Sequence, residues 1–214
     1  MEFARCISMR SFLFGSFSIF QQDLCALVGA ARLVSSSPMC RRCIFFDRDG
    51  IINRPPDPDR YVASLARFHV FPAFVDALRV ATDHGYVAIM ITNQRGIALG
   101  CMSQETVDEI HASLQAGLVC HGLGLLDIFV CPYDDDFHPW RKPNPGMILD
   151  AARIHGLDLS ASWVIGDHET DVEAGLRAGC KTILVGREGH ESAADYRVED
   201  MSRLPDLLLQ VLRS

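Results

Sequence analysis

The sequence predicts an α/β fold, a doubly wound parallel sheet with helices on both faces and no large cap domain. Three observations predict it. Short apolar runs without polar alternation recur from residue 43 onward, as expected for strands covered on both faces. Segments with helical spacing of apolar residues lie between these runs, an alternation typical of a Rossmann-like sheet. Polar residues follow several of the runs directly.

The expected strands are short apolar stretches. The clearest is CIFF at residues 43–46, because it contains no polar residue. A second, YVAIMIT, covers residues 86–92. The remaining expected strands are residues 126–132, 162–167 and 181–186, and a short edge strand within residues 195–198.

The expected helices carry recognisable start and stop residues. They cover residues 72–85, 103–122, 144–156 and 170–179, and a terminal helix ends near residue 212. Proline is favoured in the first turn, Ser, Thr and Asn at the N-cap, and Gly just past the end. The signals are Pro72 and Gly85, Ser103, Asn144 with Pro145 and Gly156, and a Thr170/Glu173 capping box.

Residues 1–39 differ from the rest of the chain. Their apolar stretch SFLFGSFSIF has only ten residues before QQD interrupts it, so it is too short to span a membrane. Arg5 and Arg10 before this stretch resemble a signal peptide, whereas Met39 stands where a compact domain would start. We expect an N-terminal extension, leader or misassigned start over residues 1–39, and one domain over residues 40–214.

Composition limits the classes of partner. The 214 residues carry a net charge of −7 and no basic tract, so nucleic acid and anionic membranes are not expected partners. The 8 cysteines show no framework spacing, which indicates reduced thiols in a cytoplasmic protein. Cys40 and Cys43 form a CxxC pair, but a zinc or redox site would need a second pair or a thioredoxin-like setting.

Polar side chains gather where the expected strands end. Because parallel sheets bind ligands at the carboxyl ends of their strands, these residues are the candidate site. They are Asp47 and Asp49 after the first strand, Thr92, Asn93 and Gln94 at the second, Arg141 and Lys142 beyond the third, and Asp167 and Asp171 after the fourth.

This set of residues favours magnesium and phosphate chemistry. Converging carboxylates repel one another unless a cation joins them, and oxygen ligands without a histidine cluster point to Mg²⁺ rather than zinc. Asp47 and Asp49 can divide the work of a nucleophile and an acid/base, and Gly50 leaves room for the phosphate. The chain lacks GxxxxGK[ST], which excludes a nucleotide P-loop.

Four segments, FFDRDGIIN, ITNQRGIALG, RKPNPGMI and VIGDHETDVEAGLRAG, resemble in order the four motifs of the haloacid dehalogenase (HAD) superfamily. They look most like its branch of D,D-heptose 1,7-bisphosphate phosphatases and histidinol-phosphatases. The resemblance covers residues 43–186 and implies a phosphatase that forms an aspartyl-phosphate.

The resemblance assigns roles residue by residue. It implies that Asp47 is the nucleophile, and that Asp49 protonates the leaving oxygen and then activates water. It implies that Thr92 and Asn93 hold the phosphoryl oxygens. Lys142 would neutralise the phosphate and orient Asp47.

It also implies a magnesium site. Asp167 would bind the ion together with Asp47 and the backbone carbonyl of Asp49. Asp171 would be a further ligand, or would support the metal site or Lys142 from behind.

Arg141 and Asn53 complete the expected substrate-binding residues. The sequence departs from the family pattern nearby: Ile51 stands where Thr is common, Arg95 where Ser is common, and Leu99 where Arg is common. Substrate contacts near this loop are therefore open, and Arg95 could restore the lost positive charge.

A second departure concerns zinc. Many relatives bind a structural zinc in the loop at 131–142 through a Cys-x-His and a Cys-x-Cys pair. This chain keeps Cys131 but has Tyr133, His138 and Trp140 at the other positions. Two candidate ligands do not close a tetrahedral site, so no structural zinc is expected.

The substrate stays open between two small phosphorylated metabolites. A heptose bisphosphate is expected first and histidinol phosphate second. Asp134, Asp135 and Asp136 are either a solvated turn or partners for a cationic substrate group. A non-catalytic binding protein of the same fold is a lower alternative, and we expect a monomer or weak homodimer.

Overall fold

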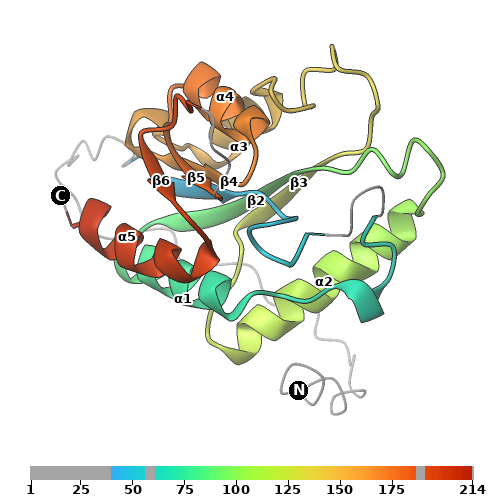
Figure 1. Ribbon diagram of the computed structural model, residues 1–214, viewed down its shortest axis with the longest axis horizontal. Helices are drawn as coiled ribbons and strands as arrows, with labels where there is room; N and C mark the ends of the chain where they lie inside the picture. The colour runs from blue at the N-terminus through green and yellow to red at the C-terminus, as the bar shows by residue number, and fades with distance from the viewer. Residues whose placement is uncertain (1–39, 56–60, 187–190, 214) are drawn as a thin grey trace, which may run out of the picture. The chain divides into compact units, whose positions relative to one another are not determined.

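A computed structural model describes residues 40–55, 61–186 and 191–213, so the predicted extension over residues 1–39 lies outside the described residues. The described chain forms a six-stranded, fully parallel sheet in the order β3-β2-β1-β4-β5-β6 (Figure 1). This order confirms the doubly wound α/β prediction. The strands are β1 Cys43–Phe46, β2 Val87–Asn93, β3 Asp127–Cys131, β4 Trp163–Gly166, β5 Lys181–Val185 and β6 Tyr196–Val198.

Helices cover both faces of the sheet (Figure 1). The α-helices are α1 Pro72–Asp83, α2 Gln104–Cys120, α3 Gly146–His155, α4 Glu169–Ala178 and α5 Leu204–Val211. α1, α2 and α5 pack on one face and α3 and α4 on the other. Among the helices of the described ranges, none has both the length and the apolar character to cross a membrane.

Alternation along β1 builds two separate cores. Ile44 and Phe46 belong to the core under α1, α2 and α5, whereas Cys43 and Phe45 belong to the core under α3 and α4. Successive strand side chains point to opposite faces, so a strand buried on both faces must be apolar throughout. This explains why the CIFF run contains no polar residue.

The strand register brings the polar residues together. Phe46, the last residue of β1, lies beside Met90 of β2 and Ile165 of β4. The next residue, Asp47, therefore emerges beside the end of β4, where its amide donates to the carbonyl of Ile165 at 2.9 Å. The sheet edge predicted to carry the site is formed by these strand ends.

Two helix starts differ from the sequence prediction. α3 begins after Pro145, and the predicted cap Asn144 instead donates its side-chain amide to the carbonyls of Asp136 and His138. α4 begins at Glu169 with His168 as N-cap and Asp171 as the capping-box partner, so the predicted Thr170/Glu173 box is wrong. At α3 contacts within the preceding loop replaced the predicted cap, and at α4 a capping box two residues earlier replaced the predicted one.

His111 of α2 gives the fold a pH dependence. The imidazole is buried, and burial followed by the positive charge of Arg48 lowers the pKa of His111 from 6.5 to about 4. Below pH 6.5 the imidazole of His111 is protonated in the unfolded chain but stays neutral in the folded chain until the pH nears 4. This group therefore lowers the free energy of unfolding as pH falls from 6.5 through 4, by about 3 kcal/mol in all.

We predict that His111→Leu removes this part of the acid sensitivity. Urea unfolding between pH 7 and pH 3.5 should show the wild type losing about 3 kcal/mol relative to the variant. His69→Gln, at an exposed histidine, is the control and should track the wild type. A stability difference between wild type and His111→Leu that does not change with pH would contradict the prediction.

Candidate active site

A tight turn after β1 creates the centre of the site. Gly50 has a φ of +89°, a conformation that side chains disfavour. A Cβ on Gly50 would lie 1.9 Å from Oδ2 of Asp167, so glycine is required for Asp167 to approach the turn. Gly166 plays the same part on β4, because a Cβ there would lie 2.2 Å from Cβ of Asp171.

These close approaches gather three carboxylates from two strand ends. Asp47 follows β1, Asp167 follows β4, and Asp171 lies in the first turn of α4. One oxygen from each lies within 4.8 Å of the others, an arrangement able to hold a metal ion. The structure thus brings together Asp47, Asp167 and Asp171 of the predicted metal ligands. Their role as ligands, and that of the backbone carbonyl of Asp49, stays a prediction.

The three carboxylates carry more negative charge than their surroundings compensate. Burial raises the pKa of Asp47 to about 7, with Asp171 adding to the rise and Lys142 opposing it. Burial, with the charges of Asp47 and Asp171, raises the pKa of Asp167 to about 8. A divalent cation among these oxygens would favour the ionised forms, so the donor set fits Mg²⁺.

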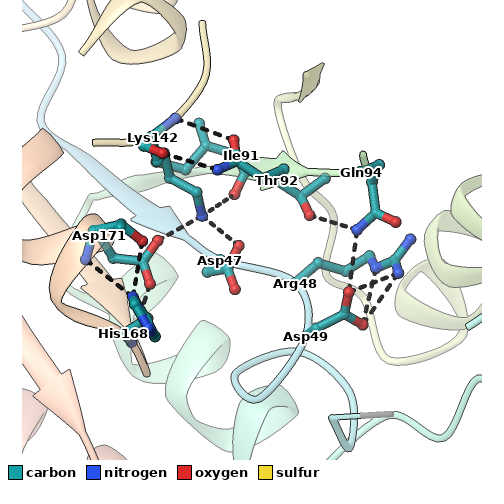
Figure 2. A network of polar contacts seen from close by, with 11 residues as sticks. Asp47, Arg48, Asp49, Ile91, Thr92, Gln94, Lys142, His168 and Asp171 are labelled. Atoms are coloured by element: carbon teal, nitrogen blue, oxygen red, sulfur yellow. Dashed lines mark hydrogen bonds and ion pairs between the residues drawn. The ribbon is translucent and has the colours of Figure 1, made fainter. Parts of the chain in front are cut away.

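Lys142 joins the cluster from the loop beyond β3. Its side chain is buried, and Nζ lies 2.5 Å from Oδ1 of Asp47 and 2.5 Å from Oδ1 of Asp171 (Figure 2). Nζ also donates to the carbonyl of Ile91 at 3.3 Å. Burial alone would lower the pKa of Lys142, but the charges of Asp171 and Asp47 outweigh it and raise the pKa. Lys142 therefore stays charged and fixes Oδ1 of Asp47.

Asp171 is engaged on both oxygens. Oδ1 pairs with Lys142, and Oδ2 accepts a hydrogen bond from the backbone amide of His168 at 3.2 Å. Both contacts support the expectation that Asp171 positions Lys142 from behind. Its oxygens still lie within reach of a shared ion with Asp47 and Asp167.

Asn93, the last residue of β2, links this strand to the loop that carries Lys142. Its side-chain amide donates to the carbonyl of Lys142 at 3.1 Å, and its side-chain oxygen accepts from the amide of Lys142 at 3.1 Å. This reciprocal pair fixes Lys142 beside the end of β2. The expected contact of Asn93 with phosphoryl oxygens stays a prediction.

Asp49 lies on the other side of the site, away from Lys142 (Figure 2). The fully buried Arg48 donates through Nη2 to Oδ2 of Asp49 at 2.8 Å. Asn53 donates to Oδ1 at 2.9 Å, and Gln94 donates to Oδ2 at 3.1 Å. Nε2 of Gln94 also donates to the hydroxyl of Thr92 at 2.8 Å. The carboxylate of Asp49 is therefore held in place by three side chains.

Sequence reasoning missed Arg48 and the role of Gln94. A basic residue between two aspartates was the available signal, but its burial could not be inferred from the pattern. Asn53, expected to bind substrate, is buried and holds Asp49. Its expected substrate contact stays a prediction.

The loop between β3 and α3 borders the site and is held by its own side chains. The rings of Tyr133 and His138 stack with centroids 3.9 Å apart. Trp140 packs edge-on against Phe129 and donates Nε1 to Asp150 at 2.8 Å. Tyr133 and Trp140, which stand where many relatives have zinc ligands, thus take part in aromatic packing. The absence of a structural zinc stays a prediction.

Comparisons with known proteins agree with this geometry. A family model described as HAD-hydrolase-like matches residues 139–213. A D-glycero-D-manno-heptose-1,7-bisphosphate 7-phosphatase of Thermosynechococcus vestitus is 34% identical over 188 residues, covering 77% of this chain and 93% of that protein. A phosphatase with the same description from Chlorobaculum tepidum is 38% identical over 162 residues, covering 70% of this chain and 80% of that protein.

A solved structure extends the similarity to the fold. The D,D-heptose 1,7-bisphosphate phosphatase of B. bronchiseptica, complexed with magnesium and phosphate, gives a TM-score of 0.71 at 31% sequence identity. The match covers 79% of this chain and 99% of that chain.

A parallel sheet whose strand ends carry these carboxylates and this lysine defines a phosphatase of the HAD type, as the four sequence motifs predicted. The chain belongs to the HAD-like hydrolase superfamily and is homologous to the D,D-heptose 1,7-bisphosphate phosphatases.

We predict that Gly50→Ala weakens metal use, because a Cβ there displaces the Asp167 carboxylate. The Mg²⁺ concentration for half-maximal phosphatase activity should rise at least about ten-fold. Gly100→Ala is the matched control: Gly100 also has a positive φ, +67°, but a Cβ there meets nothing within 4 Å.

Both variants carry the backbone strain of a left-handed alanine, about 1–2 kcal/mol. Only Gly50→Ala adds the collision with Asp167. An equal Mg²⁺ requirement in the two variants would refute the role assigned to Gly50.

Proposed function

We propose that this chain is a magnesium-dependent phosphomonoester hydrolase that forms an aspartyl-phosphate on Asp47 and acts on a small phosphorylated sugar, a heptose bisphosphate. One observation carries the proposal. Lys142 holds one oxygen of Asp47 inside an acidic cluster, while Asp49 is held separately by Arg48, Asn53 and Gln94. The proposed nucleophile and the proposed acid/base are thus held by separate sets of contacts.

Asp47, Asp167 and the backbone carbonyl of Asp49 would hold Mg²⁺, with Asp171 behind Lys142 or as a further ligand. When bound, the ion supplies positive charge that neutralises and orients the phosphoryl group. Lys142 adds a fixed ammonium, which needs no reorganisation as charge develops on the phosphoryl oxygens. Thr92 and Asn93 would hold those oxygens, and Arg141 would contact the rest of the substrate.

In the first half-reaction, Oδ2 of Asp47 attacks phosphorus because Lys142 holds Oδ1. The new bond joins Asp47 to phosphorus, and the bond from phosphorus to the sugar oxygen breaks. Asp49 donates its proton to that leaving oxygen, so the sugar departs as an alcohol.

In the second half-reaction, water attacks the phosphorus of the aspartyl-phosphate. Asp49, now ionised, takes the proton of the attacking water. The bond between Asp47 and phosphorus breaks, which returns free Asp47 and releases inorganic phosphate.

The names of the homologous phosphatases favour a heptose bisphosphate as the substrate. The contacts of the acidic residues 134 and 136 favour it as well. Asp134 and Asp136 pair with Arg95 and Arg141 rather than standing free for a cationic substrate. Histidinol phosphate is therefore the second candidate. A non-catalytic binding protein is disfavoured because every proposed catalytic group is present and engaged.

We also propose a cytoplasmic location and a monomer or weak homodimer. The exposed Cys40 and Cys101 are free thiols, as expected in a reducing compartment. Size-exclusion chromatography with light scattering tests the oligomeric state.

We predict that Asp47→Asn lowers phosphate release at least about a thousand-fold, because an amide oxygen is a poor nucleophile. The assay uses p-nitrophenyl phosphate, heptose 1,7-bisphosphate and histidinol phosphate, with and without EDTA. EDTA should abolish turnover and added Mg²⁺ should restore it. Asp76→Asn, at an exposed aspartate of α1, is the control and should keep full activity. Near-normal turnover by folded Asp47→Asn would remove the nucleophile assignment.

We predict that Gln94→Leu slows reactions that need a protonated leaving group, because Asp49 loses a hydrogen bond that positions it. The value of kcat/KM should fall about ten-fold or more for an alkyl phosphate. For p-nitrophenyl phosphate, whose leaving group needs no proton, it should fall much less. Gln104→Leu, on the exposed side of α2, is the control.

An equal loss on both phosphates would mean that Gln94 acts on phosphate binding or on the fold. That result would overturn its assignment as a positioning residue for Asp49.

A further inference from the structure

The guanidinium of Arg48 is buried, and only part of it is paired. Nε donates to Oδ1 of Asp49 at 3.3 Å, and Nη2 donates to Oδ2 of Asp49 at 2.8 Å. Figure 2 shows this group directed away from Asp47. Among the described residues, Nη1 of Arg48 has no hydrogen-bond partner, although the side chain is fully buried. A buried donor without an acceptor is costly, so this atom needs an acceptor close by.

A buried acceptor without a partner lies on α2. His111 belongs to the buried face of this helix, whose other buried residues are apolar: Val107, Ile110, Leu114 and Leu118. Nε2 of His111 is buried and, within the part of the chain that the structure describes, has no hydrogen-bond partner. A polar ring in an apolar stripe costs stability unless it is hydrogen-bonded. The donor on Arg48 and the acceptor on His111 therefore call for the same remedy.

His111 lies close enough to Arg48 for the two groups to interact electrostatically. Burial and then the charge of Arg48 lower the pKa of His111 to about 4, while the carboxylates of Asp108 and Asp49 oppose the shift. The ring is therefore neutral near pH 7, and one of its nitrogens keeps a lone pair that accepts hydrogen bonds. A neutral ring suits a neighbouring guanidinium, whereas an imidazolium would repel it.

One water molecule would satisfy both atoms. Nη1 of Arg48 and Nε2 of His111 are not bonded to each other directly. A water accepts from an N–H and donates to an imidazole nitrogen at the same time. Buried waters in proteins typically join otherwise unpaired polar groups in this way.

The side-chain tip of Arg48 is the part that depends on such a contact. The turn after β1 already holds the backbone, because the carbonyl of Arg48 accepts from the amides of Ile52 and Asn53 at 2.8 and 3.0 Å. The carboxylate of Asp49 is held by side chains, and Arg48 supplies the charged one. A guanidinium anchored on its other side offers its planar donors to that carboxylate in one orientation. Loosening Arg48 therefore loosens Asp49.

We propose that a buried water joins Nη1 of Arg48 to Nε2 of His111, and that His111 is thereby a positioning residue for Asp49. The inference rests on the proposed function, because the position of Asp49 matters to catalysis only if this residue protonates the leaving oxygen. α2 is the rigid support of the chain of contacts. His111 holds the water, the water holds Arg48, and Arg48 holds the carboxylate.

A histidine that only filled the core under α2 would behave differently. Its replacement by leucine would leave the carboxylate of Asp49 in place. Any loss of activity would then follow from loss of folded protein, and it would be equal for every phosphate ester.

The experiment compares the hydrolysis of two esters in the presence of Mg²⁺. The sugar oxygen of heptose 1,7-bisphosphate must be protonated as it leaves, whereas p-nitrophenolate needs no proton. The proteins are the wild type, His111→Leu, which removes the acceptor, and His111→Gln, whose amide oxygen can take the place of Nε2. Leu118→Ala, at a buried residue about two turns further along α2, is the matched control for lost packing.

His111→Leu should lower kcat/KM for heptose 1,7-bisphosphate about five-fold more than for p-nitrophenyl phosphate, because a hydrogen bond that positions the acid is lost. His111→Gln should recover most of this difference. Leu118→Ala should not create it, although the variant destabilises the same helix. An equal loss on both esters, no loss on either, or a His111→Gln variant that is no better than His111→Leu would overturn the positioning role.

Crystal structures of the wild type and of His111→Leu give a readout that needs no activity. The wild type should show one ordered water about 2.7–3.2 Å from both Nη1 of Arg48 and Nε2 of His111. The variant should lose this water and show a displaced Asp49 carboxylate. A wild type without the water, or a carboxylate that does not move in the variant, would overturn the inference. The proposed function fails separately, if the wild type with Mg²⁺ releases no phosphate from either ester.

Discussion

The buried ammonium of Lys142, placed between Asp47 and Asp171, is the constraint on which the site depends. Charges are removed from water at a cost of several kcal/mol each, so they are tolerated only when they are paired. Removing one partner of such a pair typically costs about 3–5 kcal/mol. This interaction joins the end of β1, the loop beyond β3 and the start of α4. It also leaves Oδ2 of Asp47, the proposed nucleophile, outside this ion pair.

The proposed catalytic groups lie on two sides of the site. Lys142 organises the side that carries Asp47, whereas the fully buried Arg48 organises the side that carries Asp49. Gln94 connects this second side to Thr92. Since each group is fixed by a different set of contacts, the proposed nucleophile and the proposed acid/base do not compete for the same hydrogen-bond donors. The glycines at 50 and 166 make the arrangement sterically feasible.

The described residues include no domain inserted over the sheet edge, so under the proposed function the loops, rather than a cap, select the substrate. The loop between β3 and α3 is held by aromatic packing and by hydrogen bonds within the loop. It presents Arg141 at a fixed position, and Asp134 extends from it toward Arg95. A change of specificity can therefore come from a few exposed side chains without disturbing the buried ion pairs.

The sequence by itself determined the strands, the helices and the row of polar residues at the strand ends. Burial on both faces demands uninterrupted apolar runs, and parallel connections bring all strand ends to one edge. Only the tertiary structure decided which polar groups pair. Nothing in the sequence around Arg48 indicates burial, yet its charged side chain is buried and donates a hydrogen bond to Asp49. Asn144 does not cap α3 because its side chain donates to a carbonyl in the preceding loop. Thr170 does not cap α4 because His168 is the N-cap of that helix. Local propensities are weak, about 1 kcal/mol, and long-range contacts of similar strength override them.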